Sequence, residues 1–170
     1  MDLSDIIDED IIIETIKPKK ESSLLYLLNE KNPQKIVDFI SHNQERLNET
    51  DEFGKSSFHY ICSNERIKET AEILKMLIDK KANPNLGDQY GKTGIHYLAT
   101  NKNLKLQMLK EIYDSIDIEL KDNKGKSILH YLSSNDSIKT EILQYCLRNG
   151  FNPRIKDNTG KTALHYFCKR

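Results

Sequence analysis

Hydrophobic and polar positions alternate along the chain in a fixed order that repeats four times. The repeated segments are DEFGKSSFHY (51–60), DQYGKTGIHY (88–97), DNKGKSILHY (122–131) and DNTGKTALHY (157–166). In each segment an Asp and a Gly predict a tight turn, the next Ser or Thr predicts a helix N-cap, and the apolar run after it predicts a short helix. The repeat glycines are Gly54, Gly91, Gly125 and Gly160, and their spacing of 34 to 37 residues is typical of stacked repeat proteins.

A second amphipathic stretch follows each of the first three segments, at 70–79, 106–116 and 140–150. Asn83-Pro84 and Asn152-Pro153 interrupt the helical pattern after two of them, and Gly150 stands where a glycine commonly ends a helix. One unit therefore contains a turn, a helix, a second helix and a loop. The position after each first apolar run is always small, which allows neighbouring helices to pack closely; its residues are Cys62, Ala99, Ser133 and Cys168.

These patterns predict an all-α solenoid of stacked helix-turn-helix units with short β-turn or hairpin fingers. Its parts are an acidic and apolar segment (1–19), a degenerate unit (20–50), three full units (51–87, 88–121 and 122–156) and a truncated unit (157–170). For residues 1–19 we consider a cap on the first unit, partial disorder, or a short docking motif. The last unit ends within or just after its first helix, so we expect either a longer protein or a partner that covers this end. Without such a cover, we expect a monomer.

Composition narrows the possible partners and compartments. The 26 basic and 26 acidic residues give a formal net charge of zero, so nothing global attracts nucleic acid or an anionic membrane. The chain has no apolar run long enough to span a bilayer and no basic secretory signal. Three widely spaced cysteines suit a reducing compartment. We therefore expect a cytoplasmic protein, with the nucleus as the alternative.

The repeated residues resemble the ankyrin repeat, whose signature is approximately D-x-x-G-x-T-x-L-H-x-A-A. The resemblance covers 51–170 well and 20–50 loosely, and it departs from the family where a proline is replaced by Ser57, Gly94, Ile128 and Ala163. It implies a non-catalytic protein–protein interaction module. Degenerate repeats in a chain rich in Lys, Ile and Asn are similar to viral ankyrin proteins, especially those of poxviruses, although bacterial effectors and protist proteins share these features. The implied partner is a host signalling or degradation factor, as for inhibitors of the IκB or host-range type. The alternative is an N-terminal scaffold whose effector domain lies beyond residue 170.

Several kinds of chemistry can be weighed against this interpretation. The periodic His59, His96, His130 and His165 lie alone in their units, whereas zinc needs several ligands at one point, so we expect them to bond turn backbone and tie units together. Cys62 follows His59 by three residues, but the same position also holds alanine and serine, which argues against a nucleophile. The GKS and GKT segments lack the first glycine of a phosphate loop. We therefore expect no enzymatic activity, no metal and no cofactor.

A column of tyrosines recurs with the histidines, at Tyr26, Tyr60, Tyr97, Tyr131 and Tyr166. Base stacking on such a column would need a basic groove, which the neutral chain does not suggest. We expect these rings to pack between the first helices with their hydroxyl groups toward water.

The surface remains as the candidate site. The resemblance places a partner against the turn tips and the exposed ends of the first helices. Phe53 and Tyr90 would then be neighbouring exposed aromatics, which are favoured as interface anchors, unless they pack on each other. A lysine also follows every repeat glycine, either as an inherited solvated residue or as a basic stripe that steers an acidic segment. The candidate residues are Phe53, Lys55, Tyr90, Lys92, Lys124 and Lys126, together with Asn64, Asn101 and Asn135.

Overall fold

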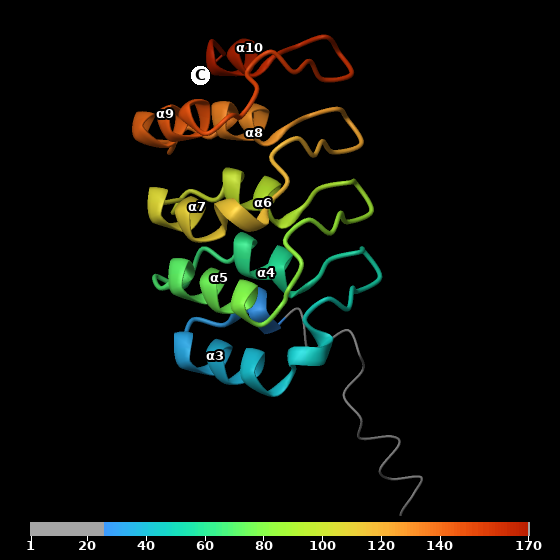
Figure 1. The fold of residues 1–170 in the computed structure, drawn as a ribbon, viewed down its shortest axis with the longest axis vertical. Coiled ribbons are helices and arrows are strands. Elements are labelled where there is room, and N and C mark those ends of the chain that lie inside the picture. Colours follow the sequence, from blue (N-terminus) through green and yellow to red (C-terminus); the bar gives the residue numbers. More distant parts are fainter. Residues whose placement is uncertain (1–25, 170) are drawn as a thin grey trace, which may run out of the picture.

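The computed structural model describes residues 26–169 and shows layers of helices stacked along one axis, with fingers projecting from one side (Figure 1). The first described layer contains α3 (Pro33–His42), which is followed by the 3-10 turn η2 (Gln44–Arg46). The next layers pair α4 (Ser57–Ser63) with α5 (Thr70–Asp79), α6 (Gly94–Thr100) with α7 (Leu106–Ile112), and α8 (Ile128–Ser134) with α9 (Thr140–Arg148). The 3-10 turn η3 (Tyr113–Ser115) extends α7, and α10 (Ala163–Phe167) forms the last layer.

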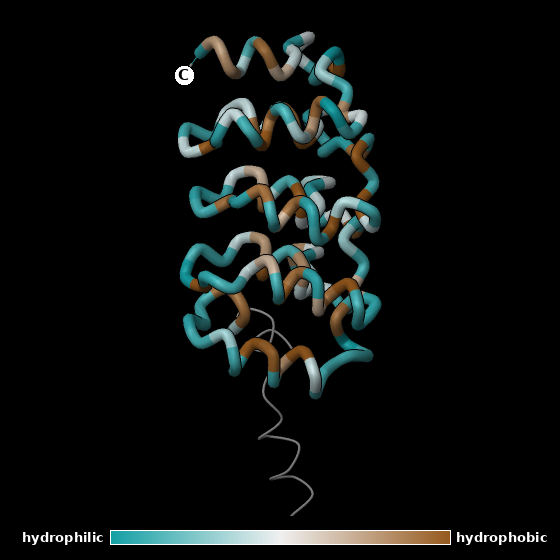
Figure 2. Tube along the Cα trace, turned by 60° about the vertical axis from the view of Figure 1, so that its left-hand side comes forward, coloured by the Kyte–Doolittle hydropathy of each residue, from teal (hydrophilic) through white to brown (hydrophobic). Residues whose placement is uncertain are grey.

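This arrangement confirms the all-α repeat solenoid. First helices pack on first helices and second helices on second helices, so each layer buries its apolar side against its neighbours. Figure 2 shows hydrophobic residues recurring in the helices of every layer. Ile61, Leu98 and Leu132 occupy the same position in successive layers and are fully buried. None of the helices in residues 26–169 has the length and hydropathy needed to cross a membrane.

Each finger is a turn built around one aspartate. In the finger of 88–92, one carboxylate oxygen of Asp88 accepts hydrogen bonds from the amides of Tyr90 and Lys92, and Gly91 donates its amide to the Asp88 carbonyl. Gly91 has φ of 70°, in the left-handed region that favours glycine. No strand forms within the described residues; a single antiparallel bridge, between Lys121 and Ser127, closes one finger. The N-terminal segment 1–19 and the start of the degenerate unit lie outside the described residues.

The second helices do not all end with glycine. Gly150 follows α9 with φ of 86°, as the sequence indicates. Lys81 occupies the equivalent position after α5 and adopts φ of 65°, a conformation that costs a side-chain-bearing residue roughly 1 kcal/mol. The carbonyl of Lys81 accepts a hydrogen bond from the Asn48 amide of the preceding layer. The chain therefore keeps the left-handed end of α5 although the glycine is missing there.

Gly94 and Phe58 form a matched pair between two first helices. A Cβ atom on Gly94 would lie 2.4 Å from Cδ1 of Phe58, closer than van der Waals contact allows. We expect Gly94→Ala to lower the free energy of unfolding by about 1–3 kcal/mol, because the buried ring has no room to move. Urea unfolding followed by circular dichroism measures this loss.

A compensating substitution and a control substitution can be chosen from the structure to test this prediction. Leu129 in α8 and Ala163 in α10 occupy the positions that Phe58 and Gly94 hold in α4 and α6. Phe58→Leu combined with Gly94→Ala therefore recreates a pair that the chain already uses. We expect the double variant to lose less stability than the sum of the single variants. A Cβ on Gly87 would meet its nearest atoms at 3.5 Å, so Gly87→Ala should be close to neutral. Additive losses in the double variant would contradict the pairing.

Candidate functional site

The repeat histidines cap their own helices. Nδ1 of His59 accepts the amide hydrogen of Ser56 at 3.0 Å, and the Ser56 side chain accepts the amide hydrogen of His59 in return. Because Nδ1 is the acceptor, the proton is on Nε2, which donates to the Lys92 carbonyl of the next finger at 2.9 Å. His130 repeats this bond to the carbonyl of Lys161 at 3.0 Å. These two rings tie adjacent layers as the sequence predicts.

The other two histidines, His96 and His165, do not make this bond to a following finger within the described residues. Nδ1 of His96 accepts the amide hydrogen of Thr93, but its buried Nε2 lies near the carbonyl of Lys126 without a hydrogen bond. His165 caps the last first helix in the same way and is exposed, because no described layer covers it. Desolvation lowers the pKa of His96 to about 4. The tie is therefore made at two of the four predicted rings.

The tyrosine column also departs from expectation. Each of the four later tyrosines donates its hydroxyl to the aspartate nine residues before it, at 2.5 Å for Tyr97 to Asp88 and for Tyr166 to Asp157. Tyr60 and Tyr131 make the same bond. The expectation that the hydroxyl groups face water is wrong, because the second carboxylate oxygen of the turn aspartate is available as an acceptor. Desolvation and then this hydrogen bond raise the pKa of Tyr97.

The lysines that follow the repeat glycines lie between these tyrosine rings. The ammonium group of Lys92 is 5.5 Å from the ring centre of Tyr97 in its own layer and 5.1 Å from that of Tyr131 in the next. Lys55 and Lys126 are placed in the same way, each over its own tyrosine and that of the following layer. Such cation–π contacts contribute about 0.5–1 kcal/mol each. Lys55, Lys92 and Lys126 are half-buried and join layers, so they are not freely solvated residues.

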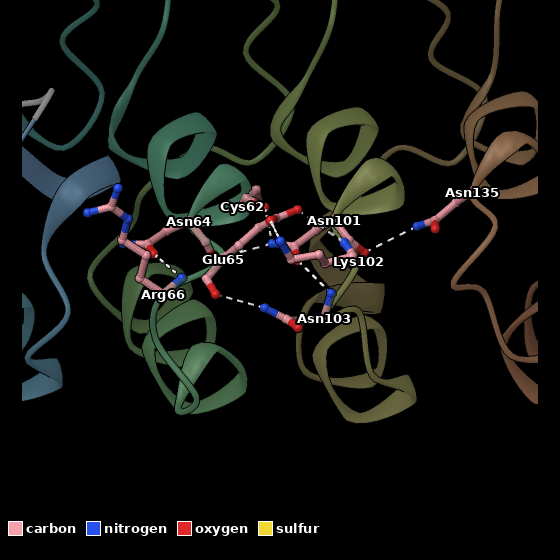
Figure 3. Close-up of polar contacts among 8 residues, drawn as sticks. All are labelled: Cys62, Asn64, Glu65, Arg66, Asn101, Lys102, Asn103 and Asn135. Atoms are coloured by element: carbon pink, nitrogen blue, oxygen red, sulfur yellow. Dashed lines mark hydrogen bonds and ion pairs between the residues drawn. The ribbon is translucent and has the colours of Figure 1, made fainter.

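The asparagines expected to contact a partner form an internal ladder instead (Figure 3). The amide of Asn101 donates to the carbonyls of Cys62 and Asn64 in the preceding layer, at 3.1 and 3.2 Å. Asn64 and Asn135 donate to carbonyls of their preceding layers in the same way. Asn64 is 1% exposed and Asn101 is 3% exposed. This burial contradicts the partner-binding role for Asn64 and Asn101, and we assign the ladder a structural role.

The turn tips remain exposed and carry the two predicted aromatics. Phe53 is 47% exposed and Tyr90 is 57% exposed, at the same position of successive fingers. The fingers are joined by backbone hydrogen bonds from Gln89 to the Phe53 carbonyl at 3.0 Å and from Asn123 to the Tyr90 carbonyl at 2.9 Å. Within the described residues no ring contact joins Phe53 to Tyr90. Both rings are therefore held on a rigid row of tips with their surfaces toward solvent.

A hollow of about 230 Å³ opens beside Tyr90. Its walls are Tyr90, Lys92, Asp122, Asn123 and Lys124. The side chain of Asn123 donates to the Gln89 carbonyl, which fixes the floor between two fingers. Lys124 is exposed at the next tip, where it occupies the position that Phe53 and Tyr90 hold in the earlier fingers. The hollow is thus continuous with the aromatic tips.

Two further concave regions lie away from the tips. One is a cleft of about 330 Å³ at the loop edge between α4–α5 and α6–α7. There the Glu65 carboxylate pairs with Lys102 at 2.7 Å, and the Glu65 carbonyl accepts a hydrogen bond from the side-chain amide of Asn103. Figure 3 draws Arg66 at this edge with its side chain extending away from Asn103. The other is an apolar groove of about 220 Å³ between α8, α9 and α10, which contains the exposed Leu147 and Leu164.

Reactive groups are not assembled on the described part of the chain. Burial raises the pKa of the Cys62 thiol, opposite to the shift that a nucleophile requires, and the nearby His59 has both ring nitrogens engaged. Cys146 is also buried, and burial raises its pKa to about 12. Among residues 26–169, no three His, Cys, Asp or Glu side chains gather as metal ligands.

The stacked helix pairs and exposed turn tips define a helical-repeat scaffold, a class that binds other proteins through its surface. The family described as ankyrin repeats (3 copies) matches residues 24–122 and 96–170. The chain therefore belongs to the ankyrin repeat family, whose members are protein–protein interaction modules and are typically non-catalytic. No curated protein matches the chain significantly.

Proposed function

We propose that this protein is a non-catalytic interaction module that holds a protein partner against its turn tips. The observation that carries the proposal is the exposure of two aromatic side chains, Phe53 and Tyr90, on adjacent fingers that are fixed by backbone hydrogen bonds. A rigid exposed aromatic loses little conformational entropy when it is buried at an interface, which makes such residues effective anchors. The Asn ladder and the Lys–Tyr contacts support the role by joining adjacent layers.

We further propose that the partner is a signalling or degradation factor of a host cell, encountered in the cytoplasm or nucleus. The resemblance of these degenerate repeats to viral ankyrin proteins supports this part of the proposal. The half-buried Lys55, Lys92 and Lys126 contribute mainly to layer stacking, while Lys124 faces solvent beside Tyr90. The binding surface therefore consists of Phe53, Tyr90 and Lys124, with Lys92 at its edge.

Affinity capture from lysates of candidate host cells, quantified by mass spectrometry, tests the proposal. We expect Phe53→Ala combined with Tyr90→Ala to reduce recovery of the bound partner at least tenfold, since two anchors are removed. Phe167→Ala is the matched control, because Phe167 is an aromatic of similar exposure (45%) at the far end of the stack. Recovery that is unchanged in the double variant, or lost equally in the control, would contradict binding at the tips.

A further inference from the structure

The hollow beside Tyr90 differs in charge from the aromatic tips that precede it. Its ionic residues are Lys92, Lys124 and Asp122. Asp122 is 6% exposed, and its carboxylate already accepts the amide hydrogens of Lys124 and Lys126 and the hydroxyl hydrogen of Tyr131. The two ammonium groups are therefore the ionic groups that a ligand in the hollow can reach, and the hollow favours an anion.

The surface consequently changes from apolar to cationic along the row of tips. Phe53 and Tyr90 offer aromatic surface on the first two fingers, and Lys124 replaces them at the same position of the third. Packed helices lie 8–10 Å apart, so successive layers bring successive tips about 10 Å apart. An extended peptide advances about 3.3 Å per residue and covers that distance in about three residues.

We propose that the tips recognise an extended segment of a partner protein in which a large apolar residue and an Asp or Glu lie about three positions apart, in either chain direction. This inference rests on the proposed function and adds the chemistry of the partner. The apolar side chain lies against Phe53 and Tyr90, and the carboxylate enters the hollow between Lys92 and Lys124. The backbone bond from Asn158 to the Lys124 carbonyl at 2.9 Å holds the third tip in place before the ligand arrives.

A protein segment fits this surface better than a nucleic acid. A polyanion would need a continuous basic track, whereas of Lys55, Lys92 and Lys126 it is Lys92 that also lines the hollow. The chain has no net charge to attract such a polymer. The hollow of about 230 Å³ has room for one acidic side chain.

Selection of random dodecapeptides displayed on phage tests the inference. Peptides enriched on the wild-type protein are expected to carry an Asp or Glu two to four positions from a Phe, Leu, Ile, Met, Trp or Tyr. A fluorescein-labelled enriched peptide is then titrated by anisotropy against single variants. We expect Lys124→Glu to weaken its binding at least tenfold, and replacement of the peptide's acidic residue with Lys to restore affinity for that variant. Lys121→Glu, at an exposed position three residues earlier, should change affinity less than twofold.

The outcomes separate this inference from the function on which it rests. One outcome is that enriched peptides lose binding in the Phe53→Ala, Tyr90→Ala variant but show no preference for an acidic residue. That result would agree with the proposed interaction module and overturn the carboxylate site. Peptides that bind independently of both aromatics would overturn the proposed function itself. A labelled oligothymidylate that binds the wild-type protein more tightly than the peptide, and is lost in Lys124→Glu, would also overturn the inference.

Discussion

Replacing Asn101 with Ala is expected to lower the free energy of unfolding by about 3 kcal/mol. The side chain is almost completely buried and donates to the carbonyls of Cys62 and Asn64. Removing it leaves two carbonyl groups inside the stack without a donor, and each such group costs about 1–3 kcal/mol. The side-chain oxygen of Asn101 also accepts the amide hydrogen of Asn103, which fixes the start of the following loop.

Urea unfolding followed by far-ultraviolet circular dichroism measures this loss. Asn135→Ala is the matched control, because Asn135 makes the same two bonds one layer later but is only partly buried, so water can replace its amide. We expect its cost to be about half that of Asn101→Ala. Equal costs for the two variants would show that burial does not determine the strength of the ladder. A cost below 0.5 kcal/mol at Asn101 would show that the ladder does not stabilise the stack.

The fold could be predicted from the sequence because each unit repeats the same local instructions. The turn, the helix cap and the apolar run recur four times at the same spacing. Their assignment therefore does not depend on any single unit. The left-handed glycines, the small position of Cys62 and Ala99, and the bond of His59 to the backbone of the next turn could be predicted in this way. The role of His59 in capping its own helix was not predicted. Nor was the need for Gly94, because only the position of the Phe58 ring shows why a side chain is excluded there.

The candidate site was predicted only in part. The repeat spacing does not indicate which residues at a helix end face the adjacent layer and which face solvent. Asn64 and Asn101 follow the first helices and look exposed in sequence, yet their side chains are buried and donate to carbonyls of the preceding layer. The constant nine-residue spacing from each turn Asp to each repeat Tyr was a signal for their hydrogen bond, since four copies of both residues keep it. The hollow beside Tyr90 depends on three-dimensional finger stacking and has no signature in a single unit.

The protein is expected to lose about 2 kcal/mol of unfolding free energy through His96 alone between pH 7 and pH 5. Its folded pKa is lowered to about 4 by desolvation, whereas the unfolded chain has a value near 6.5. As the pH falls below about 6.5 the unfolded state therefore binds a proton that the native state rejects, and this stability is lost progressively toward pH 4. Protonation would also place a hydrogen on Nδ1 opposite the amide hydrogen of Thr93, which would break the cap. Desolvation lowers the pKa of His59 as well, so it acts in the same direction.

His96→Gln isolates this effect, because glutamine at the third helical position can accept the Thr93 amide in the same reciprocal cap but does not titrate. Urea unfolding at pH 7 and pH 5 is expected to show the variant slightly less stable than wild type at pH 7 and comparable to it, or more stable, at pH 5. His165→Gln removes a capping histidine that is exposed, and it should keep the wild-type pH dependence. If His96→Gln retained the full loss between pH 7 and pH 5, the acid sensitivity would have to come from other groups. The buried His96 ring would then not determine the stability of the protein at acidic pH.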